Sequence, residues 1–451
     1  MRVVFLEMDH EREWAVASIG PAFIASYLRQ HGHEVSLLRI PLDEPVDAAV
    51  SRIVAAGAGL IGVSLTSRQW LRGRDIVGAL REVSDTPVIA GGLHPTFSAD
   101  TVLSAHGFDY CCLGEGEEPM LDLVNALEAG REQPVRGIAN IQVRGEAAPP
   151  LRPPFSPIDE LPFMARDMLG EQYGVVHMAT QRGCPYPCTY CAARQFSDLY
   201  GSYADYGRRR SLDNVIAELA ALRDSDNLNY VIFLDDTFTI NHRWVHDFCR
   251  VYGKEFGVPF SLHARVETVS ESMLHELAAA GCRHIAYGVE SGSERVRREI
   301  MHRHAPNDRF VDVFRWTREA GIITTANYIL ATPGETAAEI EQTLALHDAL
   351  KPDDFGYFVF YPYPGTALYH LCNERGYLPP DFDERPANHR RSVLNLPDLS
   401  PDEVEHFYGE FTARRERDHL KRIGEQQPEA YDVDETTRSF VDAVQTSAEL
   451  G

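Results

Sequence analysis

The sequence predicts an α/β protein: a Rossmann-like doubly wound parallel sheet at the N-terminus, a partial (β/α)6 barrel of the TIM type after it, and a helical C-terminal tail. Three observations support this. Short apolar runs alternate with helical patterns through residues 1–128, a second alternation runs through 171–371, and a helical pattern lies within 372–451. Each buried parallel strand needs a crossover helix to reach its neighbour, so the alternation predicts parallel sheets.

The N-terminal region contains five apolar runs that are typical of buried strands, at 2–7, 34–40, 59–65, 87–92 and 110–116. Ligands of open α/β sheets bind at the carboxyl ends of the strands. Small and polar residues stand at these ends, and four of them are candidate cofactor contacts: Ser64, Thr66, Gly91 and Gly92. The alternative interpretation is that these residues only form tight turns between strand and helix.

Residues 129–170 are rich in proline and arginine and are expected to form an extended linker. In the barrel region, functional residues are expected at the carboxyl ends of the strands. A capping signal at Ser400 and Glu403 predicts the start of a helix in the tail. The barrel region supplies six strand candidates, at 175–181, 230–236, 260–266, 284–290, 324–331 and 355–361.

Charge and composition limit the classes of partner. The 451-residue chain has a formal net charge of −24, which argues against nucleic acid because phosphate binding needs clustered Lys and Arg. An acidic surface suits a cationic partner, although it also serves solubility alone. No stretch approaches the ~18 apolar residues of a membrane span, and the N-terminus reaches charged residues too early for a signal peptide. We therefore expect no membrane association and a cytoplasmic location.

The segment GCPYPCTYC, residues 183–191, holds three of the eight cysteines: Cys184, Cys188 and Cys191. Three thiolates can ligate three irons of a [4Fe–4S] cluster and leave the fourth iron open to an exogenous chelate. A structural zinc site would need a fourth Cys or His at short spacing, and none follows before His242. The segment therefore predicts an iron–sulfur cluster with one free iron.

The order of motifs in the barrel region carries a resemblance to a known superfamily. The CxxxCxxC loop follows the first strand, and LDDTFT, HAR, GVESG, ATPGET and PYPGT end or follow the next five strands. In these motifs the chain resembles the radical S-adenosylmethionine (SAM) superfamily. Because a doubly wound region precedes the barrel, residues 1–370 resemble the radical SAM enzymes that have an N-terminal cobalamin (B12)-binding domain.

The resemblance implies how the cofactors are held. The three cysteines would ligate the [4Fe–4S] cluster, and SAM would chelate the open iron, where an electron cleaves it to methionine and a 5′-deoxyadenosyl radical. Tyr190 would lie against the adenine, or would only pack the loop. Glu290 would hold the SAM ammonium, and Ser291 and Gly334 are further candidate SAM contacts, although Gly334 has the alternative role of turning the chain. A flavodoxin or ferredoxin is the expected electron donor.

Three more residues end neighbouring barrel strands and are candidate catalytic residues: Asp235, Asp236 and Arg265. They are expected to face one cavity and contact SAM or substrate, or alternatively to pair structurally.

Two radical reactions remain open. The N-terminal domain favours a cobalamin-dependent C-methyltransferase, in which Arg68 or Trp70 would stand against the corrin face or occupy its space. Compact length, acidic charge and strand-end carboxylates slightly favour the second reaction, dehydration of a small cationic substrate. The resemblance here is to the radical diol dehydratases that deoxygenate paromamine-like aminoglycoside sugars in apramycin-type antibiotic biosynthesis. A carbonyl product would need a downstream reductase. Whether cobalamin is bound stays open, and an iron–sulfur electron carrier without catalysis is a further, disfavoured alternative.

Overall fold

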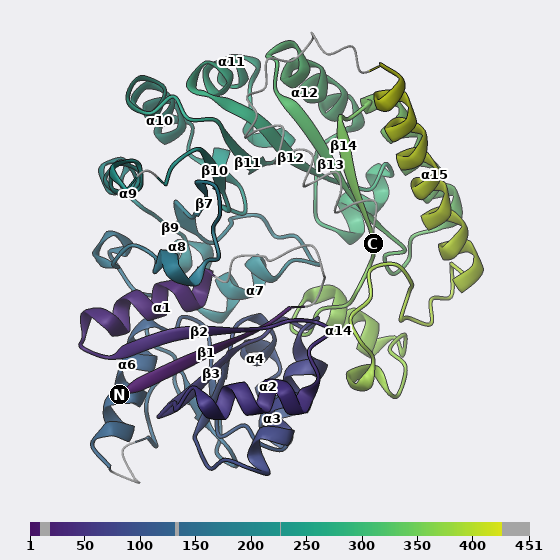
Figure 1. Cartoon of the computed structure of the whole chain (residues 1–451). Helices are drawn as coiled ribbons and strands as arrows, with labels where there is room; N and C mark the ends of the chain where they lie inside the picture. The colour runs from purple at the N-terminus through teal and green to yellow at the C-terminus, as the bar shows by residue number, and fades with distance from the viewer. Residues whose placement is uncertain (10–18, 131–134, 226, 426–451) are drawn as a thin grey trace. The chain divides into compact units, whose positions relative to one another are not determined.

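The structure is a computed structural model that describes residues 1–9, 19–130, 135–225 and 227–425 (Figure 1). The chain divides into two compact units that interleave along the sequence. Unit 1 comprises residues 1–171, 195–208 and 363–365, and unit 2 comprises 172–194, 209–362 and the residues from 366 onward. Among the described helices, none combines the length and the apolar character that a membrane crossing requires.

Unit 1 contains a six-stranded sheet in the order β2-β1-β3-β4-β5-β6. Strands β1 to β5 run parallel to one another, and β6 runs antiparallel to β5. The expected doubly wound sheet is therefore confirmed, with one antiparallel strand added. The strands are β1 (Arg2–Met8), β2 (Glu34–Ile40), β3 (Leu60–Ser64), β4 (Val88–Gly91), β5 (Tyr110–Cys112) and β6 (Ile141–Val143).

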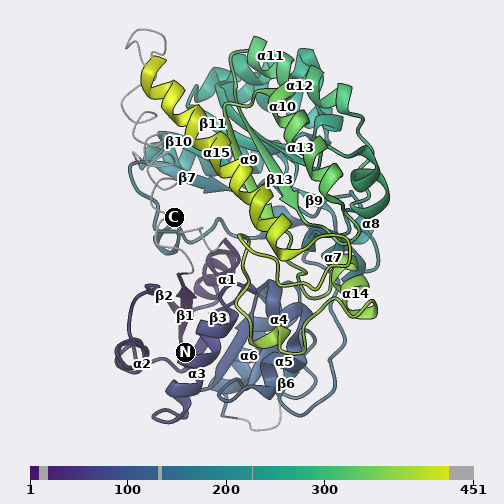
Figure 2. The ribbon, with the colours of Figure 1, turned by 90° about the vertical axis from the view of Figure 1, so that its right-hand side faces the viewer.

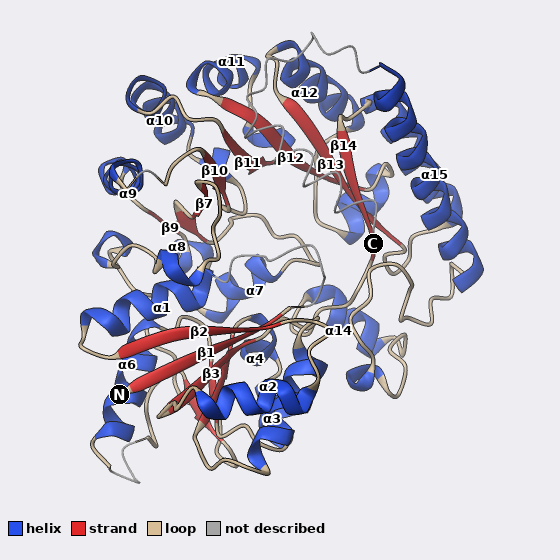
Figure 3. Ribbon diagram, viewed as in Figure 1, coloured by secondary structure: helices blue, strands red, loops and turns tan. Residues whose placement is uncertain are grey.

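Both faces of this sheet are covered by helices, which explains the continuous apolar runs of its strands. On β1, Val4 and Leu6 pack with helices α2 and α3, while Val3 and Phe5 pack with α1 and α6 on the opposite face. Figure 3 shows these helices around the strands of unit 1. The helices are α1 (Ile19–Gln30), α2 (Val46–Ala55), α3 (Trp70–Arg81), α4 (Leu93–Phe97), α5 (Ala99–Ser104), α6 (Glu117–Glu128) and α8 (Tyr203–Tyr206).

The expectation of a linker at 129–170 is corrected by the described part of that segment. Its strand β6 extends the unit 1 sheet, and Met164 and Met168 are buried in the core of the same unit. Asp167 forms an ion pair with Arg29 of α1 at 2.7 Å. Apolar side chains spaced among the prolines hold this segment against unit 1, so it belongs to the domain.

Unit 2 contains six parallel strands in the order β14-β13-β12-β11-β10-β7, which is the order of the chain reversed. This is the expected partial barrel, open between its first and last strands. The strands are β7 (Val175–Met178), β10 (Tyr230–Phe233), β11 (Phe260–Ala264), β12 (Cys282–Glu290), β13 (Ile323–Leu330) and β14 (Asp354–Val359), and the two-stranded pair β8 (Gln181–Arg182) and β9 (Arg208–Arg209) lies beside them.

Helices cover the outer side of the curved barrel sheet, as Figures 1 and 2 show for unit 2. The last of them packs on β14, where the ring of Phe411 stacks on that of Tyr357 with 5.4 Å between centroids. This confirms the helical tail up to residue 425. The helices are α9 (Leu212–Asp224), α10 (His242–Glu255), α11 (Glu271–Ala280), α12 (Asn307–Glu319), α13 (Ala337–Leu350), α14 (Ala367–Glu374) and α15 (Pro401–Glu425), while α7 (Ala192–Leu199) spans both units.

Alternation along the barrel strands decides which side chains face the interior. On β13, Thr324, Ala326, Tyr328 and Leu330 are buried, and the residues between them are half-buried. Three of the four, Ala326, Tyr328 and Leu330, belong to the core beneath the helices. Successive side chains of a strand point to opposite faces, so the half-buried set, which includes Thr325 and Asn327, lies on the inner face.

Candidate functional site

The three cysteines lie on one loop of unit 2, between β8 and α7. Cys184 and Cys188 are buried, and Cys191 is half-buried directly before α7. The amide of Cys191 donates to the carbonyl of Cys188 at 3.3 Å, so these two residues share a turn. Each thiol lies within electrostatic range of the other two. The loop therefore gathers the three predicted ligands after the first barrel strand.

The donor set fits an iron–sulfur cubane. A cubane binds one thiolate at each of three corners, so the three sulfurs need not converge on a single point. Among the described residues, no three metal-ligating side chains converge in that way. Burial raises the pKa of Cys184 and raises that of Cys191 to about 12. Both groups are thus thiols at neutral pH, and binding of the metal has to displace their protons.

Arg265 reaches the cysteine loop from the end of β11. Its Nη1 donates to Cys188 Sγ at 3.1 Å, and its Nη2 pairs with Glu267 at 2.7 Å. The guanidinium also lies 3.8 Å from the ring centroid of Tyr186. The sequence predicted a contact with SAM or substrate, whereas the structure places this cation on a cluster ligand, where it stabilises negative charge on sulfur.

The neighbouring aspartates at the end of β10 have different surroundings. Asp235 is buried and accepts bonds from the amides of Thr180 and Gln181 at 2.7 and 2.9 Å and from the Thr180 hydroxyl at 2.7 Å. It ties β10 to β7, which is the structural pairing expected as the alternative for Asp235, and its catalytic role stays a prediction. Asp236 keeps an exposed surface, and no described residue bonds its carboxylate. The protein packed around the carboxylate keeps water from it and, with the charge of Asp235 beside it, raises the pKa of Asp236 to about 6.

Glu290 is held at the end of β12 by two groups. Its carboxylate accepts a bond from the Tyr190 hydroxyl at 3.0 Å and lies 3.5 Å from the Arg303 guanidinium. The backbone of Glu290 has a φ of 68°, and a Cβ on Gly288 would collide with its Oε1. Strain of this kind is found where a side chain must be aimed precisely enough for function. Glu290 is buried at the carboxyl end of β12, which is the position from which it is predicted to bind the SAM ammonium.

Arg303 was missed by sequence reasoning. It is buried, donates to the Gly288 carbonyl at 2.6 Å and to the Tyr190 hydroxyl at 3.2 Å, and follows a π-helical turn at Val296–Ile300. Nothing in the local sequence separates it from the arginines around it, because the irregular turn decides which one points inward. Tyr190 itself packs against a small core that contains Phe360, as its alternative interpretation expected.

Ser291 lies in a buried hydrogen-bond network at the end of β12. Its side chain is completely buried, and its hydroxyl donates to Glu335 at 3.3 Å. The carboxylate of Glu335 also accepts bonds from the amide and hydroxyl of Thr332. These bonds join the end of β12 to the ATPGET loop, and the SAM contact of Ser291 stays a prediction. Gly334 has a φ of 82°, a backbone conformation that glycine adopts readily in turns.

In unit 1, the candidate residues after β3 and β4 mostly shape turns. The amide and hydroxyl of Thr66 donate to Gln69 at 2.9 and 3.0 Å. Gly92 has a φ of 99°, and a Cβ there would lie 2.9 Å from the Leu65 carbonyl. Ser64 and Gly91 are half-buried partners across β3 and β4. Gly91 and Gly92 leave the sheet edge without side chains.

The loop after β3 does not present Trp70 to a ligand. Trp70 is buried, stacks on His94 with 5.0 Å between ring centroids, and lies 5.9 Å from the centroid of Phe108. Arg68 lies within electrostatic range of Tyr363 in the same unit. Trp70 is therefore a core residue.

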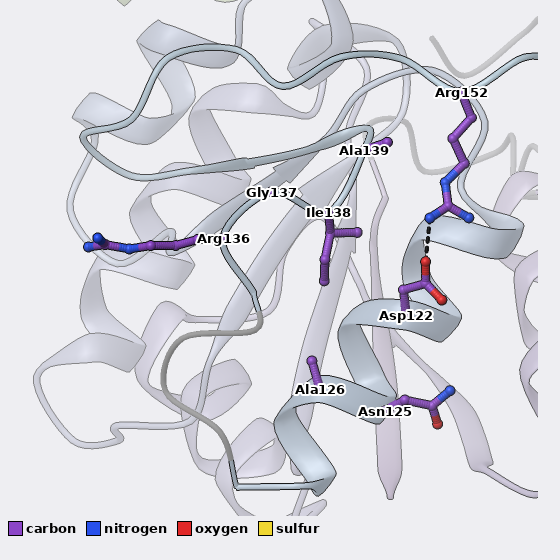
Figure 4. A pocket seen from close by; sticks show the side chains of 8 residues that line it. All are labelled: Asp122, Asn125, Ala126, Arg136, Gly137, Ile138, Ala139 and Arg152. Carbon is purple, nitrogen blue, oxygen red and sulfur yellow. Dashed lines mark hydrogen bonds and ion pairs between the residues drawn. The ribbon is translucent and has the colours of Figure 1, made fainter.

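A surface cavity of about 480 Å³ lies elsewhere in unit 1 and is lined by α6 and the segment after residue 135 (Figure 4). Across it, Arg152 is ion-paired with Asp122, and Arg136 points away toward Glu146, with which it pairs at 2.7 Å. None of the predicted site residues lines this cavity.

Comparison with known proteins identifies both regions. The family model of the B12 binding domain matches residues 11–124, and that of the radical SAM superfamily matches 178–347. An uncharacterised methyltransferase of Pyrococcus horikoshii is 27% identical over 373 residues, which cover 78% of each chain. The cytidylyl-2-hydroxyethylphosphonate methyltransferase of Streptomyces wedmorensis is 23% identical and matches 90% of this chain and 88% of that protein.

Solved structures of the same architecture support these matches at the level of the fold. The radical SAM methyltransferase TsrM from Kitasatospora setae, with cobalamin and a [4Fe–4S] cluster bound, has a TM-score of 0.67 at 18% identity, over 83% of this chain and 75% of that one. The cobalamin-dependent enzyme OxsB, with aqua-cobalamin and SAM bound, has a TM-score of 0.71 at 16% identity, over 99% and 75%. The chain therefore contains a B12-binding domain followed by a radical SAM domain.

Proposed function

We propose that this protein is a cobalamin-dependent radical SAM C-methyltransferase for a small substrate, with a [4Fe–4S] cluster, SAM and cobalamin as cofactors. The observation that carries the proposal is the B12-binding domain joined to a barrel with an intact cysteine loop. Relatives that match most of the chain include proteins named as methyltransferases. These relatives favour methyl transfer over dehydration, the reaction that the net charge and length of the chain favoured slightly.

The residues of unit 2 fit the cluster and SAM. Cys184, Cys188 and Cys191 would hold the cluster, and Glu290 would bind the SAM ammonium. When bound, these groups supply the 5′-deoxyadenosyl radical that takes a hydrogen atom from the substrate, and cobalamin supplies the methyl group. Burial raises the pKa of Glu290, and Arg303, whose guanidinium lies 3.5 Å from the carboxylate, opposes this rise.

The described edge of the unit 1 sheet fits a flat macrocycle over β3 and β4. Gly92 and Leu93 are exposed there, and 42% of Leu93 is uncovered, so this part of the edge offers an apolar surface to a ligand. His94 offers no metal ligand because its ring is buried against Trp70. Cobalamin would bind this edge without a histidine from the β4 turn.

The test is cofactor loading followed by product analysis. Protein produced with abundant cobalamin and reconstituted anaerobically should carry corrin at about one per chain. With SAM and a reductant it should form 5′-deoxyadenosine and add one methyl group to its substrate. Cys188→Ala should lose cluster absorbance and 5′-deoxyadenosine formation, whereas Cys249→Ala, a buried cysteine outside the loop, should keep both. Active wild-type protein without corrin would sink the methyltransferase proposal.

A second candidate, radical dehydration of a paromamine-like amino sugar, is favoured by Asp236. Its carboxylate has no described bonding partner, and its pKa of about 6 suits proton exchange with a leaving hydroxyl near neutral pH. In this reaction a hydrogen atom leaves one hydroxyl-bearing carbon, and the neighbouring hydroxyl takes a proton and leaves as water. The hydroxyl on the radical carbon loses its proton as the carbonyl forms, and the resulting α-carbonyl radical would accept an electron from a flavodoxin- or ferredoxin-type donor and a proton from water. A separate reductase would then act on the carbonyl.

The β5 end of the unit 1 sheet edge is covered, which also favours the dehydration candidate. The Tyr200 hydroxyl stands where a Cβ on Gly114 would project, and it accepts a bond from the Glu115 amide at 2.8 Å. Tyr200 thus covers the β5 end of the edge, within the same unit. Loss of one water from the substrate by corrin-free protein would establish dehydration. Dehydration would require the Asp236 carboxylate, whereas methyl transfer would not.

A further inference from the structure

The turn after β11 places an arginine and a carboxylate side by side. β11 ends at Ala264, Arg265 continues in an extended conformation, and Val266–Thr268 form a tight turn. The amide and the hydroxyl of Thr268 both donate to the carbonyl of Arg265, at 3.0 and 2.9 Å. The turn thereby returns the Glu267 carboxylate to the Arg265 guanidinium, whose Nη2 donates to Oε1 at 2.7 Å. Local chain geometry therefore fixes this ion pair.

The guanidinium of Arg265 is held against Cys188 by two further side chains. Its Nη1 donates to Cys188 Sγ at 3.1 Å, while Glu267 accepts from Nη2. On another side, the ring centroid of Tyr186 lies 3.8 Å from the guanidinium carbon. Only 7% of the Arg265 side chain is exposed. Because this contact is shielded from water, a full positive charge acts on the sulfur with little screening.

The charged groups around the cysteine loop are arranged asymmetrically. Cys188 lies in the field of two buried arginines, Arg265 and Arg303. The other two cysteines of the loop lie in the field of the Asp236 carboxylate. Of these three charged groups, Arg265 is the one that bonds a sulfur directly. The Cys188 side of the loop is therefore the side on which added negative charge is stabilised.

A cation bonded to a cluster ligand affects the electron that the cluster accepts. Reduction of a [4Fe–4S] cluster by one electron adds one negative charge to its iron–sulfur core and thiolates. An N–H···S bond from a cation stabilises this reduced state more than the oxidised state, so it raises the reduction potential. A carboxylate that neutralises part of the same cation has the opposite effect.

We propose that Arg265 and Glu267 together set the reduction potential of the [4Fe–4S] cluster through the sulfur of Cys188. Arg265 raises the potential by its bond to the sulfur, and Glu267 lowers it by offsetting part of the guanidinium charge. Tyr186 holds the guanidinium in place and is a positioning residue. The proposal rests on the cluster of the proposed function and on neither of the two reactions that would follow SAM cleavage.

The test is an anaerobic potentiometric titration of cluster-reconstituted protein without SAM or substrate. Titanium(III) citrate supplies the electron, and the paramagnetic resonance signal of the reduced cluster reports its amount. In Arg265→Met the sulfur loses its cation and Glu267 is left unpaired. At the wild-type midpoint potential, the ratio of reduced to oxidised cluster should therefore fall about tenfold, which is about 59 mV for a one-electron couple.

The variant Glu267→Gln should shift the potential in the opposite direction. It keeps the bond from Arg265 to sulfur and removes the negative charge that offsets the guanidinium, so the same ratio should rise about threefold or more. Opposite shifts from two residues of one ion pair separate tuning from damage to the loop, because damage has no reason to reverse its sign.

The matched controls are Arg298→Met and Glu299→Gln, which remove the same charges from an exposed ion pair on the π-helical turn. Both should keep the wild-type potential. Arg265→Lys keeps the positive charge but lacks the planar fork that reaches Cys188 and Glu267 together, so it should recover part of the potential that Arg265→Met loses. Tyr186→Leu removes the ring beside the guanidinium and should shift the potential in the direction of Arg265→Met.

Binding of SAM is the competing role for Arg265. Its Nε is buried and has no hydrogen-bond partner among the described residues, so it could donate to the SAM carboxylate. Weaker SAM binding by Arg265→Met together with an unchanged SAM-free potential would establish that role and overturn the proposal. Shifts of the same sign in Arg265→Met and Glu267→Gln would overturn it as well.

Iron content and corrin content are measured on the same preparations. If Arg265→Met assembled no cluster, Glu267→Gln and Arg265→Lys would decide, because both keep a cation beside Cys188. Wild-type protein without corrin would refute methyl transfer and leave the tuning assignment standing. The proposed function and the tuning assignment can therefore fail separately.

Discussion

Glu290 shows how a single carboxylate is prepared for a cation. It leaves the regular strand conformation at a φ of 68°, and the absence of a side chain on Gly288 gives its carboxylate room. Burial alone would raise its pKa and favour the neutral acid, but Arg303 and the Tyr190 hydroxyl oppose that rise. The charged form of Glu290 is thus favoured by a residue thirteen positions later in the chain, although burial still raises the pKa overall, and Arg303 is therefore a positioning residue.

Replacement of Arg303 tests this role. In Arg303→Met the buried Glu290 loses its cation and takes up a proton more readily, so we expect SAM to bind about tenfold or more weakly. Arg303→Lys keeps the charge but lacks the planar fork that reaches both Gly288 and Tyr190, so it should recover part of the affinity. Equilibrium dialysis of SAM against reconstituted protein measures the change.

The matched control is Arg298→Met, which removes an exposed arginine from the preceding π-helical turn. It should bind SAM as wild type does. If Arg303→Met also bound SAM with unchanged affinity, the assignment of Arg303 to Glu290 would be wrong.

At the level of elements, buried polar residues tie the strand ends to each other. Asp235 bonds the backbone that follows β7, and the Ser291–Glu335 pair joins the end of β12 to the loop after β13. These ties shape the rim of the barrel, on which Asp236 and Glu290 are displayed. A buried acceptor of this kind is costly to leave unpaired, which explains why each one has several donors.

Glu335 makes the rim sensitive to pH. Burial raises its pKa from 4.5 to about 7, so between these pH values the folded protein holds a proton that the unfolded chain releases. Stability from this group is complete below about pH 4.5, falls as pH rises, and reaches its lower level above pH 7. Glu335→Gln imitates the protonated acid and should therefore be about 2 kcal/mol more stable than wild type above pH 7 and equal to it near pH 4.5.

Thermal unfolding of the cluster-free protein between pH 4.5 and 8 measures this difference, with Glu299→Gln as an exposed control. A Glu335→Gln variant whose stability relative to wild type did not change across that range would contradict the assigned ionisation.

At the scale of the whole molecule, the chain returns to unit 1 after it has begun unit 2. Residues 195–208 belong to unit 1, where Phe196 contacts Phe97 edge-on at 5.4 Å between centroids. Arg208 forms a half-buried ion pair with Glu115. The N-terminal domain is thus completed by a segment that follows the cysteine loop.

Two lengths of the N-terminal region test this completion. A chain that ends at Glu171 leaves Phe97 uncovered and Glu115 without its arginine, whereas a chain that ends at Arg208 contains both partners. We expect the shorter chain to melt at least about 5 °C lower, because a lost aromatic contact and ion pair cost a few kcal/mol. Equal melting temperatures would show that residues 195–208 do not stabilise unit 1.

Much of the fold followed from local patterns in the sequence. The apolar run at 34–40 matches β2 and the run at 284–290 lies within β12, because strands that pack against helices need apolar side chains on the covered face. The segment 129–170 was misjudged because β6 has only three residues and its pairing with β5 leaves no local pattern. Proline content outweighed the few apolar residues that fix the segment to the core.

By itself, the sequence determined the two parallel sheets, the order of these sheets along the chain and the loop of three cysteines, since periodicity and spacing are properties of short segments. The tertiary structure alone decided which strand-end residue does what. Asp235 and Asp236 are adjacent and look alike in the sequence, yet the carboxylate of Asp235 is bonded to Thr180, whereas no described residue bonds the carboxylate of Asp236. Arg303 was assigned in the same way, because contacts between segments far apart in the sequence fix where each side chain points.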